Sequence, residues 1–121
     1  MTNQYNGETC KDLQAALDII SGKWKPIILF HLMENDKLRF SELQRAIPEI
    51  TKKMLTSQLR ELEHHNIINR KVYQQVPPKV EYSMSEYGLG LKPLLVSMRS
   101  WGYDHLKHIN NLHDEDNIKL V

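Results

Sequence analysis

Residues 51–84 read TKKMLTSQLRELEHHNIINRKVYQQVPPKVEYSM, and the pattern of this stretch changes from helical to strand-like partway along. Its first part, residues 51–65, repeats apolar side chains at helical spacing behind Thr51, a good N-cap. The inner face is expected to carry Met54, Leu55, Leu59 and Leu62. Its second part, residues 67–84, alternates apolar and polar residues as strands do, on either side of the prolines at 77–78. Because proline cannot donate to a sheet ladder, the prolines belong at a hairpin tip.

Three shorter helices are predicted before this stretch, over residues 13–20, 26–33 and 39–45. Gly22 can end the first helix in a left-handed conformation. Pro48 prevents the third helix from running into residues 51–65, because its ring clashes with the preceding turn. Two short helices joined by a tight turn, the second one polar and basic outside, are typical of a helix-turn-helix.

A last helix is predicted over residues 88–108, and beyond Ile109 the acidic chain is expected to fray. The expected fold class is therefore α+β, mostly helical: a winged helix-turn-helix with a two-stranded wing hairpin at 67–84. N- and C-terminal helices would serve dimerisation. We expect a single domain over 1–121, ordered over about 10–108.

Composition excludes several classes. The 121 residues suit one compact core, and no run of about 18 apolar residues could span a membrane. The polar N-terminus has no signal-peptide pattern, and the single cysteine, Cys10, cannot form an intramolecular disulfide. We therefore expect a cytoplasmic protein.

Charge is unevenly distributed along the chain. The net charge is only +1, but residues 51–79 hold six basic and two acidic residues, a local charge of +4. Such a concentrated patch fits a polyanion, although a solvated helix face alone would also carry such charges. The basic helix followed by a basic hairpin favours DNA, because one helix fits the major groove. The Arg60 guanidinium could donate two hydrogen bonds to a guanine edge, and the lysines could contact phosphates. The candidate DNA-binding residues are Arg39, Ser41, Thr51, Lys52, Lys53, Thr56, Ser57, Arg60, Arg70, Lys71 and Lys79.

Several blocks resemble the HxlR-type transcriptional regulators over about residues 10–108. They are GKW at 22–24, RFSEL at 39–43, IPEIT at 47–51, LTSQLRELE at 55–63 and VPPKVEYSMS at 76–85, with Gly88 and Trp101. The resemblance implies a dimeric winged-helix repressor or activator of MarR-like architecture. Two departures are Asn66, where the family usually has glycine, and Lys79, where arginine is common. Asparagine tolerates the left-handed cap, whereas lysine loses bidentate geometry.

Dimerisation is also expected from the apolar stripe of the last helix, which exceeds what so small a core can cover. The alternative is that the stripe packs within its own domain. The candidate interface residues are Leu13, Leu17, Leu91, Leu94, Leu95, Met98 and Trp101. A two-fold dimer would place two basic helices about one DNA turn apart, matching a palindromic operator.

Cys10 is a candidate redox sensor. It stands beside Lys11 and just before the first helix, and both features favour the thiolate, whereas Glu8 and Asp12 oppose it. Some members of the resembled family carry a cysteine near this position and respond to oxidants or electrophiles. The alternative is a plain terminal cysteine.

His105 and His108 are better explained as a solvated helix end than as metal ligands, so we expect no metal and no cofactor.

No catalytic pattern is present: the sequence has no phosphate-binding glycine loop, no Gly-x-Ser-x-Gly and no HExxH. We therefore expect a DNA-binding transcriptional regulator, a repressor, and not an enzyme. Two alternatives stay open. One is a winged-helix protein-interaction module that does not bind DNA. The other is a thiol enzyme using Cys10, which lacks a companion base nearby in sequence.

Overall fold

A computed structural model describes residues 7–120, with side chains described from 10 to 113. The elements run α1 (Gly7–Ile20), α2 (Lys25–Glu34), β1 (Leu38–Arg39), α3 (Phe40–Ala46), α4 (Lys52–His64), β2 (Ile68–Tyr73), β3 (Lys79–Met84), a 3-10 helix η1 (Gly88–Leu91) and α5 (Lys92–Leu120). The chain divides into two compact units, one ending at Gly90 and the other beginning at Leu91. None of the described helices is long and apolar enough to cross a membrane.

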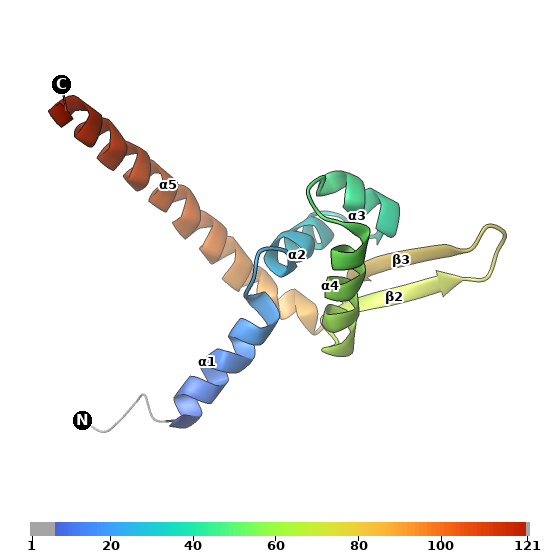
Figure 1. The fold of residues 1–121 in the computed structure, drawn as a ribbon. Coiled ribbons are helices and arrows are strands. Elements are labelled where there is room, and N and C mark those ends of the chain that lie inside the picture. The colour runs from blue at the N-terminus through green and yellow to red at the C-terminus, as the bar shows by residue number, and fades with distance from the viewer. Residues whose placement is uncertain (1–6, 121) are drawn as a thin grey trace. The chain divides into compact units, whose positions relative to one another are not determined.

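The first unit holds the core. Figure 1 shows α2, α3 and α4 grouped beside the root of the β2–β3 hairpin, whose tip projects away from them. The helix α2 is apolar nearly all round and begins with Pro26 in its first turn, as expected. Side chains less than 3 % exposed come from α2, α3, α4 and β2: Ile28, Leu29, Leu32, Leu43, Leu55, Leu59, Leu62 and Ile68. His31, also in α2, is half-buried.

The sheet has three strands, not the two expected from the sequence. Its order is β1-β3-β2, and both pairings are antiparallel. In the hairpin Val72 lies opposite Val80, as the alternation predicts. The short strand β1 adds to the free edge of β3, with Leu38 opposite Tyr82. Two residues carry no period, so this strand could not be recognised from its own sequence.

The turn between α4 and β2 is built as predicted. Asn66 has φ 61°, the left-handed conformation that an asparagine tolerates after a helix. Opposite it, the Ser85 hydroxyl lies 2.7 Å from the Asn66 carbonyl oxygen and accepts a hydrogen bond from the Gly88 amide at 2.8 Å. A Cβ at Gly88 would clash with the Ile67 carbonyl oxygen, so only glycine fits there. These contacts close the base of the wing.

The second unit differs from the sequence expectation. The segment expected as helix from 88 begins as η1, and α5 then continues through Leu120. The helix therefore extends twelve residues beyond the end predicted at 108. The physical reason is that no glycine or proline follows Gly102, so nothing in the sequence breaks the helix.

Candidate nucleic-acid interface

The helix α4 has two chemically distinct faces. Leu55, Leu59 and Leu62 are at most 1 % exposed and hold the helix to the core. The opposite side carries the candidate contacts Lys52, Lys53, Ser57 and Arg60, all exposed, and the half-buried Thr56. The helix is strongly amphipathic in the way that a groove-binding helix must be, because one face is already occupied by the core.

The N-terminus of α4 is capped as predicted, because the Thr51 hydroxyl accepts a hydrogen bond from the Met54 amide at 3.1 Å. The assignment of Met54 to the inner face is wrong, since this side chain is 39 % exposed. It lies one helical step off the leucine stripe, where the Gln58 amide contacts its sulfur at 3.5 Å.

An ion pair ties α4 to α2. The Lys25 Nζ lies 2.8 Å from Glu61 Oε2, and the lysine side chain is only 13 % exposed. Glu61 is therefore paired with a lysine of α2, although it also borders the hollow lined by the cationic residues of α4. The cationic side chains of α4 keep the outer face, where they border a shallow hollow.

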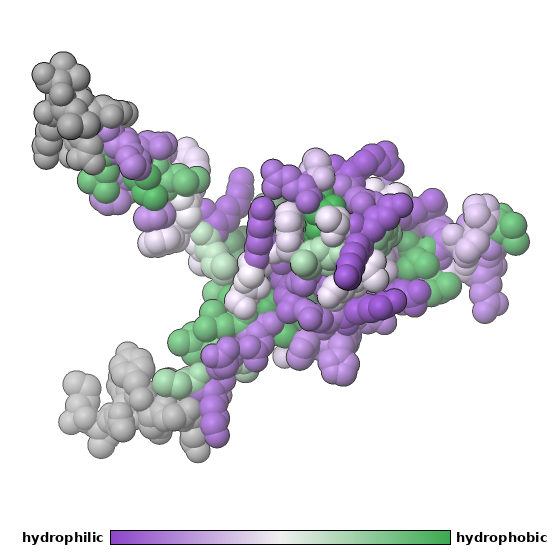
Figure 2. Space-filling model, viewed as in Figure 1, coloured by the Kyte–Doolittle hydropathy of each residue, from purple (hydrophilic) through white to green (hydrophobic). Residues whose placement is uncertain are grey.

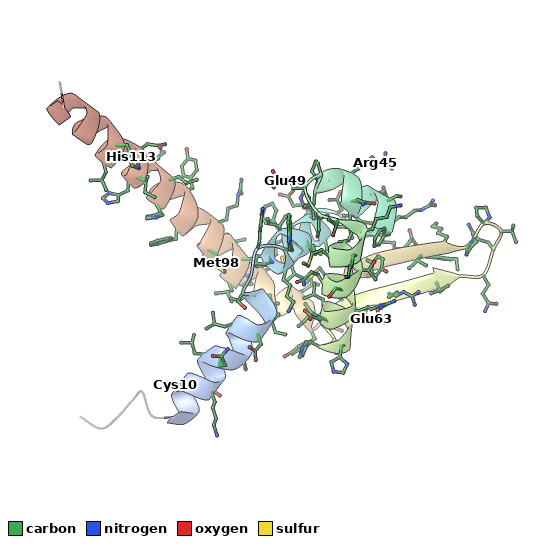
Figure 3. All side chains as sticks on the ribbon, in the orientation of Figure 1. Cys10, Arg45, Glu49, Glu63, Met98 and His113 are labelled. Atoms are coloured by element: carbon green, nitrogen blue, oxygen red, sulfur yellow. The ribbon has the colours of Figure 1, made fainter. Side chains whose placement is uncertain are left out.

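The root of the wing lies against α4. Thr56 and Arg60 of α4 line one hollow of about 420 Å³ together with Arg70 of β2. The structure therefore brings together the helix and wing residues that the sequence predicted separately. Glu63, which Figure 3 labels on α4, borders the same hollow.

Two wing lysines share one aromatic ring. Lys71 Nζ lies 4.8 Å from the centroid of the Tyr73 ring, and Lys79 Nζ lies 4.7 Å from it. Lys79 also lies 3.7 Å from Glu81 Oε2. The hydrogen bond from Tyr73, then nearby cations that include Lys79, lower the pKa of Glu81 despite partial burial. The predicted wing lysines are thus positioned by neighbours that the sequence analysis did not name.

The start of α3 adds a further basic region. Arg39 and Ser41 are exposed and line a hollow of about 450 Å³ with Lys37 and Arg45. The Arg39 amide donates to Glu42 Oε1 at 2.9 Å, which fixes the first turn of α3. In Figure 2 hydrophilic residues cover most of the visible face of α3 and α4. Lys37, Arg45 and Glu81 were missed because their proximity depends on β1 pairing with β3.

The candidate dimer residues lie on both units. Leu13 and Leu17 of α1 are 62 % and 40 % exposed. On α5, Leu94, Met98 and Trp101 are 40 %, 41 % and 67 % exposed, and Leu91 is half-buried. Leu95 is only 4 % exposed in the single chain, so it offers little surface to a partner.

Cys10 is exposed and lies within the first turns of α1, not before the helix as expected (Figure 3). The helix begins at Gly7, three residues before Cys10. His105 stacks on Trp101 with ring centroids 4.8 Å apart. Among residues whose side chains are described, no three His, Cys, Asp or Glu side chains gather as a metal site.

Known proteins that are similar to this chain in sequence and structure are helix-turn-helix regulators. The model of the HxlR-like helix-turn-helix family matches residues 19–110. YdeP of Bacillus subtilis (strain 168), an uncharacterized HTH-type transcriptional regulator, is 50 % identical over 100 residues, which cover 83 % of this chain and 77 % of YdeP. The crystal structure of the putative HTH-type transcriptional regulator ytcD is 55 % identical with a TM-score of 0.75, covering 78 % of this chain and 96 % of that one.

The redox regulator HypR in its reduced form is 46 % identical with a TM-score of 0.78, covering 83 % of this chain and 98 % of HypR. In its oxidized form the TM-score is 0.73. These relatives are transcriptional regulators and not enzymes, and they share the winged helix-turn-helix described above. The chain belongs to the HxlR-like helix-turn-helix family and is a transcriptional regulator of the helix-turn-helix type.

Proposed function

We propose that this regulator binds double-stranded DNA sequence-specifically as a homodimer and represses transcription from a palindromic operator. The observation that carries the proposal is the division of α4 into a buried leucine face and an exposed face with Lys52, Lys53 and Arg60. A major groove admits one helix of this kind. The family membership supports the same assignment.

The exposed residues divide between two kinds of DNA contact. Arg60 is assigned to a base edge, because a guanidinium can donate two hydrogen bonds to a guanine. Lys52 and Lys53, in the first turn of α4, are assigned to phosphates. The wing residues Arg70 and Lys79 are assigned to the flanking backbone or minor groove. Phosphate contacts would supply affinity and base contacts would supply specificity.

The dimer is supported by apolar surface left on both terminal helices. In α5 exposed apolar side chains recur far along the helix: Leu94, Met98, Trp101, Leu106 and Leu112 are each at least 40 % exposed. Figure 2 also shows hydrophobic residues along α1. Such surface on a small protein favours a partner, and a second copy would give two α4 helices for two operator half-sites.

A fluorescence titration tests this proposal directly. The protein is titrated into a labelled random duplex and into its own upstream region at several salt concentrations. We expect tighter binding to the upstream region and a steep loss with salt, because log K falls by about 0.9 per phosphate contact for each unit of log salt. Absence of binding at low salt would instead favour a protein-interaction module.

We also propose that Cys10 makes DNA binding responsive to thiol oxidants. Its exposure in the first turns of α1 supports this, as does the similarity to HypR, a redox regulator. Two Cys10 thiols, one from each protomer, would pass two hydrogens to diamide and form an intersubunit disulfide. That bond would change the dimer geometry and therefore operator affinity.

The matched control for this step is Cys10→Ser, which keeps size and polarity but cannot be oxidised to a disulfide. Diamide should weaken operator binding by the wild-type protein and leave Cys10→Ser unchanged. Non-reducing electrophoresis should show the covalent dimer in the wild-type protein alone. An equal effect of diamide on both proteins would exclude Cys10 as the sensor.

A further inference from the structure

One face of the three-stranded sheet gathers basic residues around a single carboxylate. The β1–β3 register places Arg39 opposite Glu81, and the β2–β3 register places Lys71 opposite the same Glu81. Residues directly opposite in neighbouring strands point to the same face of a sheet. Lys79, two residues before Glu81, and its partner Tyr73 share that face. Glu81 is therefore flanked by basic residues on both neighbouring strands.

Glu81 contacts several of these neighbouring side chains. Its Oε2 lies 3.7 Å from Lys79 Nζ, and the two side chains are only 15 % and 26 % exposed. The Tyr73 hydroxyl donates to it, and Lys37 and Arg39 act on it through space. These contacts lower the pKa of Glu81 and so favour its charged form.

The position is an unusual one for a carboxylate, because Lys79 is assigned to the DNA backbone or minor groove and the neighbours Lys71 and Arg39 are candidate DNA contacts. Glu42, the other acid that borders the hollow beside Arg39, already accepts the Arg39 amide and caps α3. Glu81 caps no helix and lies in β3, the middle strand of the sheet. A negative charge there repels a DNA backbone and reduces the charge that the wing presents.

We propose that Glu81 is a specificity-determining residue of the wing, which holds Lys79 in an ion pair until a correctly placed phosphate displaces it. This inference rests on the proposed DNA binding. A partly exposed ion pair is weak, so a phosphate delivered in the right register can replace the carboxylate. A randomly placed duplex would meet a wing whose charge is partly cancelled. Specificity of this kind comes from penalising the wrong partner.

Glu81→Gln tests the proposal, since it removes the charge and keeps the size. We expect affinity for a random duplex at about 0.1 M salt to rise about threefold, with a salt slope steeper by about 0.9, the value for one more phosphate contact. Affinity for the upstream region should rise less, so the ratio of the two affinities should fall. Glu86→Gln, an equal charge change at an exposed site outside the strands, should leave that ratio unchanged.

Two further variants separate this role from a structural one. In a Lys79→Met background, Glu81→Gln should raise the affinity for random DNA less than in the wild type, because only the direct repulsion of the backbone is then relieved and no lysine is released. Glu81→Asp, which keeps the charge, should retain discrimination close to that of the wild type. A gain as large in Lys79→Met as in the wild type, or an equal loss on both duplexes with a lower melting temperature, would overturn the proposal.

The result also distinguishes this inference from the proposed function. If the wild-type protein binds neither duplex at low salt, DNA binding itself fails and the role of Glu81 fails with it. If the wild type discriminates between duplexes and Glu81→Gln discriminates equally well, only the role of Glu81 is refuted.

Discussion

Ser85→Ala should destabilise the protein more than its small change in volume suggests. The Ser85 side chain is buried, and its hydroxyl lies 2.7 Å from the Asn66 carbonyl oxygen and 3.0 Å from that of Ile67. The same oxygen accepts from the buried Gly88 amide at 2.8 Å. Ile67 keeps a second partner, the Ser85 amide at 3.0 Å. The variant therefore leaves chiefly the Gly88 donor unpaired, and the backbone cannot close the gap because Gly88 already lies against Ile67.

An unsatisfied buried donor costs about 1–3 kcal/mol. With a urea m-value of about 2 kcal/mol/M, the unfolding midpoint should fall by about 0.5–1.5 M while m stays constant. The assay is urea unfolding followed by circular dichroism at one fixed protein concentration, since a dimer's stability depends on concentration. Ser83→Ala, in the half-buried position two residues earlier, is the matched control. A midpoint shift below about 0.2 M, or an equal shift in both variants, would refute the reasoning.

Four further predictions concern the site and the assembly. Arg60→Ala should cost about 1–3 kcal/mol in operator binding and relax specificity at one base pair, measured with operators substituted one position at a time; equal losses on random DNA would remove base reading from Arg60. Lys79→Ala should weaken operator binding and reduce the operator salt slope by about 1, with a smaller loss on random DNA, where Glu81 still holds the lysine; the same titrations measure both. Leu94→Asp should shift the protein from dimer to monomer in sedimentation, whereas an unchanged dimer would place the interface elsewhere. Because the pKa of Glu81 is lowered on folding, its stabilisation is present at neutral pH and is lost as pH falls through that lowered value, so Glu81→Gln should flatten the acid side of a melting-temperature profile.

Much of the winged helix-turn-helix unit was predictable because its signals are local. The leucine spacing of α4 specifies a helix with one buried face, and Thr51 marks its start. Asn66 marks the left-handed turn that follows, and the alternation after it specifies the hairpin. The exposed basic side of α4 follows directly, since residues off the leucine stripe of a helix must face solvent.

Predictions from local sequence failed for the exposure of one side chain and for the start of one helix, because both depend on the residues packed around them. Met54 is as apolar as its neighbours, but it lies beside the buried stripe and stays exposed. Cys10 was expected before α1, yet the helix begins upstream of it at Gly7. A helix end is the least specified part of a helix, because its last turn forms few hydrogen bonds of its own.

The family, the helices that form the core and the basic face of α4 could therefore all be predicted from local patterns in the chain. The pairing of β1 with β3, and the position of Glu81 among the basic residues of the wing, depend instead on contacts between distant residues. The difference lies in the sequence separation over which each signal acts. Helical periodicity and caps are read within a few residues, whereas Leu38 and Tyr82 meet across more than forty residues of chain once the core has folded. A two-residue strand has no pattern of its own, and its partner creates it.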